Sequence, residues 1–576
     1  MDLEKILPLV EKPSRYINSE WNSRHKYASQ NTKNAVQTCF CFPDLYEIGM
    51  SNLGLEILYG IVNNRDDALA ERVYAPGLDL EKILRRENLP LFSLESARPL
   101  KEFDLLGFTF QYELVFTNFL NILDLAGLPV RSKDRVEAFP LIAAGGPCAA
   151  NPEPMADFVD FFVFGEGEGL IGQIIEKIKE EKNKNNPDKK RLLKNLARLK
   201  GVYVPGFYQV SYFDHGPIKK IQPIDSFAPS RVERVFVDLE TAFYPTRPLV
   251  PFLDTVHNRL TVEIARGCPR ACRFCQASTI YRPYRRRSLE KNLQLIAEAL
   301  PATGYEEICL ASLSTTDYPD IEPLVKKILE RYQQERIAIS LPSLRCDAFS
   351  LSLAGMIQKV KRANLTFAIE AGTDRLRRSL RKDLSEEQIF NTLRMAVEKG
   401  WKLIKLYFMF GLPGEKTEDV EGIVSLVKRI KKISPRLNLN ITISPFVPKA
   451  HTPFQWAKQE ERQSLRDKSN FLIKNLSGQV KFHRVEQAYI EGVLARGDRR
   501  LSPVIEKAWR LGCKFDQWQE FFNFSLWEQA FNEEGVDPGF YLHRERTGEE
   551  IFPWQVLESG VSNEFLWKEY LASKND

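Results

Sequence analysis

The chain has few of the residues that form disulfides or bind transition metals, with 9 cysteines and 6 histidines in 576 residues. The cysteines are odd in number and scattered, which excludes a dense disulfide framework and favours a reducing compartment. No stretch approaches the roughly 18 apolar residues of a membrane-spanning helix, and the N-terminus lacks the apolar segment of a secretory signal. We therefore expect a cytoplasmic protein that has no membrane partner.

Neither sign of charge dominates the sequence. Lys and Arg total 81 and Asp and Glu total 76, a net charge of +5. So small an excess does not by itself predict nucleic-acid binding, and any basic patch must be local. The composition is 43% hydrophobic, enough at this length to fill more than one core. We expect two large domains with smaller additions.

Short apolar runs alternate with helical patterns in two long series, which predicts an α/β fold. The first series has the rhythm of a doubly wound, Rossmann-like parallel sheet. In the second, strands are expected at 259–266, 306–312, 337–344, 365–370, 403–410 and 439–444, which predicts a partial (β/α)6 barrel with its chemistry at the carboxyl ends of the strands. The expected division is an N-terminal extension (1–34), a Rossmann-like domain (35–183), a linker and β-rich connector (184–248), the partial barrel (249–477) and a small, mainly helical C-terminal region (478–576).

Three cysteines stand together directly after the first expected barrel strand, in the segment ARGCPRACRFCQAS. They are Cys268, Cys272 and Cys275, and no fourth cysteine or histidine lies near them in the sequence. A structural zinc ion normally closes with four protein ligands. Thiolates also suit iron–sulfur clusters, and three of them leave one iron of a four-iron cube open to another ligand. A structural zinc site and an electron-transfer cluster remain as alternatives.

The C-x3-C-x2-C spacing, with Phe274 before the last cysteine, resembles that of radical S-adenosylmethionine (SAM) enzymes. The resemblance implies that Cys268, Cys272 and Cys275 are the metal ligands of a [4Fe–4S] cluster whose open iron is chelated by SAM. It also implies reductive cleavage of SAM to a 5′-deoxyadenosyl radical. A flavodoxin- or ferredoxin-type electron donor is implied as a partner.

Other barrel segments are similar to the SAM-binding segments of this family, although the usual Gly-Gly-Glu after the second strand is absent. The resemblance places SAM contacts at the ends of the second to fifth strands, with Arg381 as a substitute for Lys382. The SAM-binding residues implied in this way are Phe274, Ser312, Ser314, Ser343, Arg345, Glu370, Arg381, Lys382, Gly411 and Gly414.

The segment DLYEIGMSNLG in the first domain resembles the cobalamin-binding signature D-x-H-x-x-G, with tyrosine in place of histidine. Tyrosine is a weak ligand unless it is ionised, and its ordinary pKa is near 10, so we do not expect it to bind cobalt. The implied cobalamin-binding positions are Asp44, Tyr46, Gly49, Thr109, Gly145 and Gly146. The alternative is a domain that keeps this fold and binds nothing.

From residue 35 to the C-terminus, the chain resembles an uncharacterised bacterial branch of radical SAM proteins with a B12-binding domain. The resemblance implies a transferase, and the first hypothesis is cobalamin-dependent methylation of a macromolecular substrate, RNA or protein. The second is radical sulfur insertion or methylthiolation of tRNA or a ribosomal protein. It is weakened because Cys39, Cys41 and Cys148 do not form a second close triad. The third is a non-enzymatic iron–sulfur or cobalamin redox sensor. The sequence indicates no catalytic side chain beyond the cofactor ligands.

Overall fold

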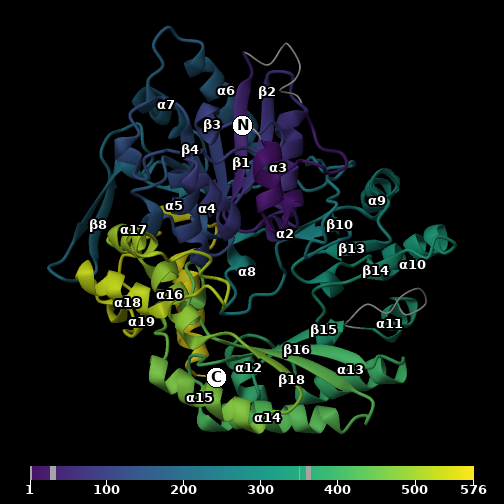
Figure 1. Cartoon of the computed structure of the whole chain (residues 1–576). Coiled ribbons are helices and arrows are strands. Elements are labelled where there is room, and N and C mark those ends of the chain that lie inside the picture. Colours follow the sequence, from purple (N-terminus) through teal and green to yellow (C-terminus); the bar gives the residue numbers. More distant parts are fainter. Residues whose placement is uncertain (1–2, 26–33, 349, 358–364, 576) are drawn as a thin grey trace.

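The structure, a computed structural model, describes residues 3–25, 34–348, 350–357 and 365–575. It contains a Rossmann-like domain, a connector, a partial barrel and a helical C-terminal region (Figure 1), which confirms the predicted fold class. No helix of the described residues is both long enough and apolar enough to cross a membrane.

The first domain is built on a six-stranded sheet with the order β2-β1-β3-β4-β5-β6. Strands β1 to β5 are parallel and β6 is antiparallel to β5. The strands are β1 Val36–Phe42, β2 Ala68–Tyr74, β3 Leu105–Thr109, β4 Leu141–Gly145, β5 Phe161–Val163 and β6 Val202–Tyr203. The chain runs outward from β1 to β2 and then crosses to β3, so the strand order reverses between β1 and β3. Sheets of this kind bind ligands at that point, outside the carboxyl ends of the strands.

Helices cover both faces of this sheet, which explains why its strands read as continuous apolar runs. Six of the seven residues of β1, with the sequence VQTCFCF, are buried. The helices of this part are α1 Leu3–Ile6, α2 Tyr46–Gly49, α3 Leu53–Asn63, α4 Leu78–Arg86, α5 Phe116–Leu125, α6 Ile171–Lys182 and α7 Lys189–Leu196. The start of α3 is fixed by Asn52, whose side chain accepts a hydrogen bond from the amide of Leu55 at 2.9 Å.

The barrel consists of two parallel sheets, β10-β13-β14 and β15-β16-β17-β18. Among the described residues, an isolated bridge between Leu344 and Phe367 connects the two halves. The strands are β10 Leu260–Glu263, β13 Glu307–Ala311, β14 Ala338–Ser340, β15 Leu365–Glu370, β16 Leu403–Phe410, β17 Asn438–Pro445 and β18 Gln479–Phe482. A short antiparallel pair, β11 Ala265–Arg266 and β12 Arg285–Arg286, follows β10. The barrel helices are α8 Ala277–Ile280, α9 Leu289–Thr303, α10 Ile321–Tyr332, α11 Leu351–Ile357, α12 Asp374–Ser379, α13 Glu386–Glu398, α14 Thr417–Lys431 and α15 Arg462–Asn475.

The barrel sheet runs beyond the boundary expected at residue 477. Strand β18 pairs in parallel with β17, with Thr442 opposite Lys481. Its sequence, QVKF, lacks an apolar run because it is the edge strand of its sheet and is only half-buried. Polar edge strands of this kind are common in natural sheets, and they hide the strand from a search for hydrophobic periodicity.

The C-terminal region packs on the first domain. Asp516 accepts a hydrogen bond from the Thr117 hydroxyl at 2.7 Å, and the amide of Phe515 donates to the Asn118 side chain at 2.8 Å. The apolar side chains of the two regions form one buried cluster. The region contains α16 Val485–Arg496, α17 Leu501–Leu511, α18 Phe524–Glu533, α19 Pro538–Leu542 and α20 Asn563–Ser573. The connector contributes the hairpin β7 Tyr208–Tyr212 and β8 Ile218–Pro223, and β9 Val232–Glu233, which pairs with β19 Leu557–Glu558.

Candidate functional site

The three clustered cysteines lie in the loop between β11 and α8, at the carboxyl end of the first barrel strand. The loop begins at Gly267, whose φ is +81°, and a Cβ there would lie 2.6 Å from the carbonyl oxygen of Tyr281. Glycine alone has no Cβ, so it can adopt this positive φ and lie this close to the Tyr281 carbonyl. Cys272 is buried, and Cys268 and Cys275 are half-buried.

Arg273, which the sequence did not single out, anchors this loop to the segment after β15. Its amide donates to the carbonyl of Leu380 at 3.0 Å, and its guanidinium donates to the carbonyl of Ser379 at 2.8 Å. Arg273 is buried, so these hydrogen bonds fix the loop in a water-poor setting. They bring Cys272 beside Lys382.

A buried ion pair stands next to the Cys272 thiol. The ammonium of Lys382 lies 3.0 Å from the Glu370 carboxylate, and both side chains are largely buried. Burial alone would lower the pKa of Lys382, but Glu370 and Cys272 together outweigh it, so the pKa of Lys382 is raised. Burial raises the pKa of Cys272, while Lys382 and Arg345 act in the opposite direction by favouring the thiolate.

Glu370 is held in an unusual backbone conformation. Its φ is +74°, and the register of β15 against β16 shifts between Ala368 and Glu370, where a bulge interrupts the ladder. A residue with a side chain in the left-handed region costs on the order of 1–3 kcal/mol, and such strain is concentrated at functional sites. The bulge turns Glu370 toward Lys382 at the end of the strand.

A chain of charged side chains joins the cysteine loop to the ends of the next two strands. Arg345 forms two hydrogen bonds to Asp347, at 2.9 and 3.0 Å. Arg270, two residues after Cys268, lies 3.5 Å from Asp347 and binds Asp317 at 2.6 and 2.9 Å. Ser314 donates to Asp317 at 2.7 Å. Arg345 and Ser314 therefore share one network, and its other members were not identified from the sequence.

The remaining residues implied for SAM are spread more widely. Arg381 lies 3.0 Å from Glu569 of α20 and is half-exposed, so its guanidinium serves an interdomain ion pair while Lys382 faces Glu370. Phe274 packs against the buried apolar cluster that joins the first domain, the C-terminal region and part of the barrel. Ser343 is half-buried, and its carbonyl accepts from the amide of Thr315 at 3.0 Å.

Gly411 and Gly414 shape the turn after β16. Their φ angles are +72° and +75°. A Cβ on Gly411 would lie 2.4 Å from a methyl carbon of Leu465, and its amide donates to Glu415 at 2.8 Å. A Cβ on Gly414 would meet nothing within 4 Å. Gly411 is thus required by packing, whereas Gly414 lies in open space.

The donor set of the cysteine loop suits an iron–sulfur cube. Burial, followed by the neighbouring thiols of Cys272 and Cys268, raises the pKa of Cys275 to about 12, so the three thiols lie close together. Among the described residues, no three His, Cys, Asp or Glu side chains converge on a point where one metal ion could bind. In an iron–sulfur cube each cysteine binds a different iron, so convergence on one point is not needed.

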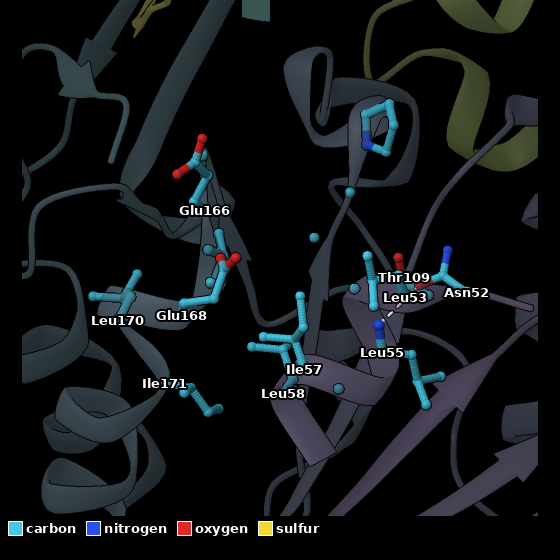
Figure 2. A pocket seen from close by; sticks show the side chains of 18 of the residues that line it. Asn52, Leu53, Leu55, Ile57, Leu58, Thr109, Glu166, Glu168, Leu170 and Ile171 are labelled. Carbon is cyan, nitrogen blue, oxygen red and sulfur yellow. Dashed lines mark hydrogen bonds between the residues drawn. The ribbon is translucent and has the colours of Figure 1, made fainter. Parts of the chain in front are cut away.

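A cavity of about 450 Å³ lies between the sheet of the first domain and the first strands of the barrel. Figure 2 shows side chains of α3, including Ile57 and Leu58, facing Leu170 and Ile171 at the start of α6. Glu166 and Glu168 lie on one side of it, and Asn52 and Thr109 on the other. The barrel contributes Arg266, Gly267, Tyr281, Ala311, Ser312 and Leu313 to its lining. The cavity therefore extends from the strand-order reversal of the first sheet to the residue before Cys268.

Glycines keep part of this cavity wall free of side chains. Gly54 and Gly145 line the cavity, and a Cβ on them would have no neighbour closer than 3.4 and 3.8 Å. Gly146 also lines it, with φ +90° and with Phe110 backbone atoms so close that a Cβ would lie 2.8 Å from the carbonyl oxygen. The cavity has the shape and apolar lining that a large cofactor tail needs. Thr109, Gly145 and Gly146, three of the positions that the resemblance implied for cobalamin, line this cavity.

The three signature positions, Asp44, Tyr46 and Gly49, do not line this cavity, although the end of their segment, 52–54, does. The Tyr46 hydroxyl donates to Glu20 at 2.9 Å, and its ring meets Tyr74 edge to face at 5.2 Å. Burial, followed by the Glu20 charge, raises the pKa of Tyr46 far above its ordinary value. A Cβ on Gly49 would lie 2.3 Å from the Tyr74 ring.

Asp44 is also held away from the cavity. Its carboxylate accepts from the Trp518 indole at 3.0 Å and from the Leu45 amide at 2.7 Å. Asp44, Tyr46 and Gly49 therefore fix the fold of the first domain and its contact with the C-terminal region.

Charged residues that sequence reasoning missed tie the two domains together at the cavity edge. Glu166 accepts two hydrogen bonds from Arg285, at 2.6 and 2.8 Å, and lies 3.2 Å from Arg266. Arg266 also pairs with Glu168 at 2.7 Å and with Glu263 at 2.8 Å. The motif GEGE was visible in the sequence, but its arginine partners lie about a hundred residues away.

Two family models match the chain. One, described as "Radical SAM proteins, N-terminal", matches residues 54–205, and the other, "Radical SAM superfamily", matches residues 262–427. The uncharacterized protein MJ0966 of Methanocaldococcus jannaschii is 30% identical over 424 residues, which cover 73% of this chain and 83% of that protein.

Two further relatives match a smaller part. The ribosomal protein uS12 methylthiotransferase RimO of Petrotoga mobilis is 27% identical over 182 residues, 30% of this chain and 40% of that protein. The tRNA-2-methylthio-N(6)-dimethylallyladenosine synthase of Ehrlichia canis is 22% identical over 251 residues, 41% of this chain and 56% of that protein.

Solved structures share the fold at low sequence identity. The radical SAM methyltransferase TsrM from Kitasatospora setae, solved with cobalamin and a [4Fe–4S] cluster, has a TM-score of 0.50 and 14% identity, with 73% of this chain and 76% of that chain covered. The cobalamin-dependent SAM radical enzyme OxsB, solved with aqua-cobalamin and SAM, has a TM-score of 0.50 and 13% identity, with 94% and 79% covered. The chain belongs to the radical SAM superfamily, whose members use a [4Fe–4S] cluster and SAM, and it has the two-domain fold of the B12-binding branch.

Proposed function

We propose that this radical SAM enzyme is a cobalamin-dependent methyltransferase that acts on an RNA or protein substrate. One observation carries the proposal: a single cavity extends from the glycine-lined wall of the first domain to Gly267 and Ser312 of the barrel. Gly267 directly precedes Cys268, so a cofactor held in the first domain would adjoin the cysteine loop.

In this proposal Cys268, Cys272 and Cys275 hold the cluster. SAM would contact the charged groups beside Cys272, which are Lys382, Glu370 and Arg345. Lys382 and Glu370 form an ion pair, and all three charges act on the pKa of Cys272. When bound, the cluster and SAM supply a 5′-deoxyadenosyl radical. An electron donor of the flavodoxin or ferredoxin type would reduce the cluster.

The buried cation of Lys382 has two tasks in this arrangement. It favours the thiolate form of Cys272, which is the form that binds iron. It also keeps the Glu370 carboxylate oriented at the end of β15, where the bulge has already turned it inward. The ion pair is largely buried, so the polar groups are positioned before a cofactor binds and need little reorganisation.

Thr109, Gly145 and Gly146 would hold cobalamin, which supplies a methyl group when bound. The Thr109 hydroxyl is a polar group in a mostly apolar cavity and already accepts a hydrogen bond from Gln111 at 2.6 Å. The absence of side chains on the two glycines allows a bulky tail to approach the backbone. The structures of TsrM and OxsB, which share this fold and were both solved with cobalamin bound, support cobalamin as the cofactor of the first domain.

Methylthiolation is the second candidate, supported by the RimO and tRNA methylthiotransferase relatives. Against it, Cys39 and Cys41 are buried within β1, and Cys148 is buried in the turn after β4. Cys39 and Cys41 belong to the strand β1, and Cys148 is buried near Glu113, Lys449 and Glu491. A redox sensor, the third candidate, would bind the cluster without cleaving SAM.

Product analysis under anaerobic conditions separates the three candidates. The reconstituted protein is incubated with cobalamin, a strong reductant and SAM, and 5′-deoxyadenosine, S-adenosylhomocysteine and bound cobalamin are quantified. Methyl transfer predicts both products together with retained cobalamin. Deoxyadenosine without retained cobalamin would contradict the cobalamin assignment, and an intact cluster that yields neither product would favour the sensor.

A further inference from the structure

Polar side chains line the inner face of the second half of the barrel. Along β16, alternate residues such as Leu406 and Phe408 are buried between the sheet and its covering helices. Lys405 and Tyr407 lie on the opposite, inner face of the sheet. The Tyr407 side chain is 41% exposed although β16 lies between two other strands. Figure 1 shows α13 and α14 beyond the other face of this sheet.

Five of these side chains form a continuous surface across three strands. Lys405 is opposite Asn440, Tyr407 is opposite Thr442, and Thr442 is opposite Lys481. We call Lys405, Tyr407, Asn440, Thr442 and Lys481 the lumen platform. In the described chain, no hydrogen bond or ion pair engages any of these five side chains. The platform carries two positive charges and no carboxylate.

The first half of the barrel is different on its inner face. Arg259 binds Glu307 at 3.1 Å and Ser340 at 3.3 Å, and Cys309 is buried. Those polar groups satisfy one another. A closed (β/α) barrel is normally filled by bulky apolar side chains. In the described part of the second half, by contrast, the exposed Tyr407 ring and the two lysines near it have no hydrogen-bond or ion-pair partner, so this surface is free to bind a ligand.

The chemistry of the platform matches a single-stranded nucleic acid. An exposed aromatic ring on a sheet stacks a base, and lysines on either side bind the phosphates of the strand. The amide of Asn440 and the hydroxyl of Thr442 supply the hydrogen bonds that read a base edge or a ribose 2′-hydroxyl. An acidic peptide would neutralise the lysines but would leave the ring without a stacking partner.

The platform also lies next to the proposed radical site. Ala368 is opposite Tyr407 in the β15–β16 ladder, and Glu370 follows two residues later at the end of β15. A base stacked on Tyr407 would thus lie one side-chain layer below the Glu370–Lys382 pair. We propose that the lumen platform binds single-stranded RNA and that the substrate of this enzyme is an RNA, an inference that rests on the proposed function for the identity of the reaction.

The test measures how a fluorescein-labelled, unstructured 12-nucleotide RNA binds to the reconstituted full chain. Fluorescence anisotropy gives the affinity over a range of salt concentrations. Tyr407→Leu is expected to weaken binding by about fivefold to 150-fold, since stacking contributes about 1–3 kcal/mol per base. Tyr407→Phe keeps the ring and is expected to restore binding to within about twofold of the unaltered chain.

The double variant Lys405→Gln, Lys481→Gln is expected to reduce the slope of log affinity against log salt by about 1.4, since each neutralised phosphate contributes about 0.7 for single strands. The matched controls are Phe213→Leu and Lys219→Gln. They remove an exposed aromatic ring and a lysine that lies 5.9 Å from it, on the β7–β8 hairpin far from the platform. Both controls are expected to bind RNA like the unaltered chain.

Three results would overturn the inference. They are RNA binding that is insensitive to Tyr407→Leu, DNA of the same sequence binding as tightly as RNA, and Tyr407-dependent binding of an unstructured acidic peptide in place of RNA. Deoxyadenosine formation by the unaltered chain is measured separately in the same preparation. If it fails while RNA binding depends on the platform, the proposed reaction is wrong and the RNA assignment stands.

Discussion

The cysteine loop and the cavity of the first domain are built in opposite ways. Around the loop, charged side chains are largely buried and form ion pairs, Lys382 with Glu370 and Arg345 with Asp347. The cavity wall depends instead on missing side chains, at Gly54 and Gly145, and on the apolar faces of two helices. The first site is defined by chemical groups and the second by space. Substitutions should therefore damage the first by removing an atom and the second by adding one.

The largest effect is expected at the cluster ligands. Cys272→Ala should abolish both the iron–sulfur absorbance of the reconstituted protein and the formation of 5′-deoxyadenosine, a loss of more than about a hundredfold, because three thiolates are needed to hold the cube. Cys513→Ala, a buried cysteine of the C-terminal region, is the matched control and should keep both. Retained cluster and product in Cys272→Ala would refute the ligand assignment.

The next effect is expected at Lys382. Lys382→Met removes the buried cation and leaves the Glu370 carboxylate without its partner, which is costly in a buried site. The affinity for SAM, measured by equilibrium dialysis, should fall at least tenfold, which is about 1.4 kcal/mol of binding free energy. Arg381→Met is the control, since Arg381 pairs with Glu569 and should change SAM binding by less than about twofold. A larger effect at Arg381 than at Lys382 would reverse the assignment of the two neighbours.

A smaller effect is expected when the cavity wall is filled. Gly145→Val places a branched side chain in the cavity, and cobalamin retained after gel filtration should fall by about tenfold because the tail and the side chain compete for one space. Gly206→Val, at an exposed glycine with open space around it, is the control. Full retention of cobalamin in Gly145→Val would show that the cofactor, if bound, lies elsewhere.

The smallest effect is expected at Tyr46. Tyr46→Phe removes only the hydrogen bond to Glu20, and the free energy of unfolding should fall by about 1–2 kcal/mol, since the bond is buried and its acceptor is charged. Thermal denaturation measures this loss. Cobalamin retention should be unchanged, because Tyr46 faces Glu20 and Tyr74 outside the cavity. A loss of cobalamin without a loss of stability would contradict that placement.

The comparison of the two sites also explains how much the sequence could predict. Periodicity located the barrel strands β15 and β16 at their observed bounds, and residue spacing located the cysteine loop. The strand β18 was missed because a half-exposed edge strand has no apolar run. The motif around Tyr46 was interpreted as a ligand segment, yet its side chains are engaged by Glu20, Tyr74 and Trp518. A motif gives residue types and spacing, but the direction of each side chain depends on partners elsewhere in the chain.

Long-range contacts account for the other gaps. Arg273 binds the carbonyl of Ser379, 106 residues later, and Arg285 binds Glu166, 119 residues earlier. No local pattern marks such pairs, because each depends on how two separately folded elements dock. The choice between Lys382 and Arg381 has the same origin, since adjacent residues point to opposite sides and only the packed structure shows which one faces Glu370.

The most direct test of the account is whether the cluster and cobalamin occupy neighbouring parts of one cavity. Electron paramagnetic resonance spectra of the reduced protein would be recorded with the cluster alone, with cob(II)alamin alone and with both groups bound. The account predicts a spectrum for the doubly loaded protein that is broadened by magnetic interaction between the two unpaired spins. A spectrum equal to the sum of the two separate signals would contradict it.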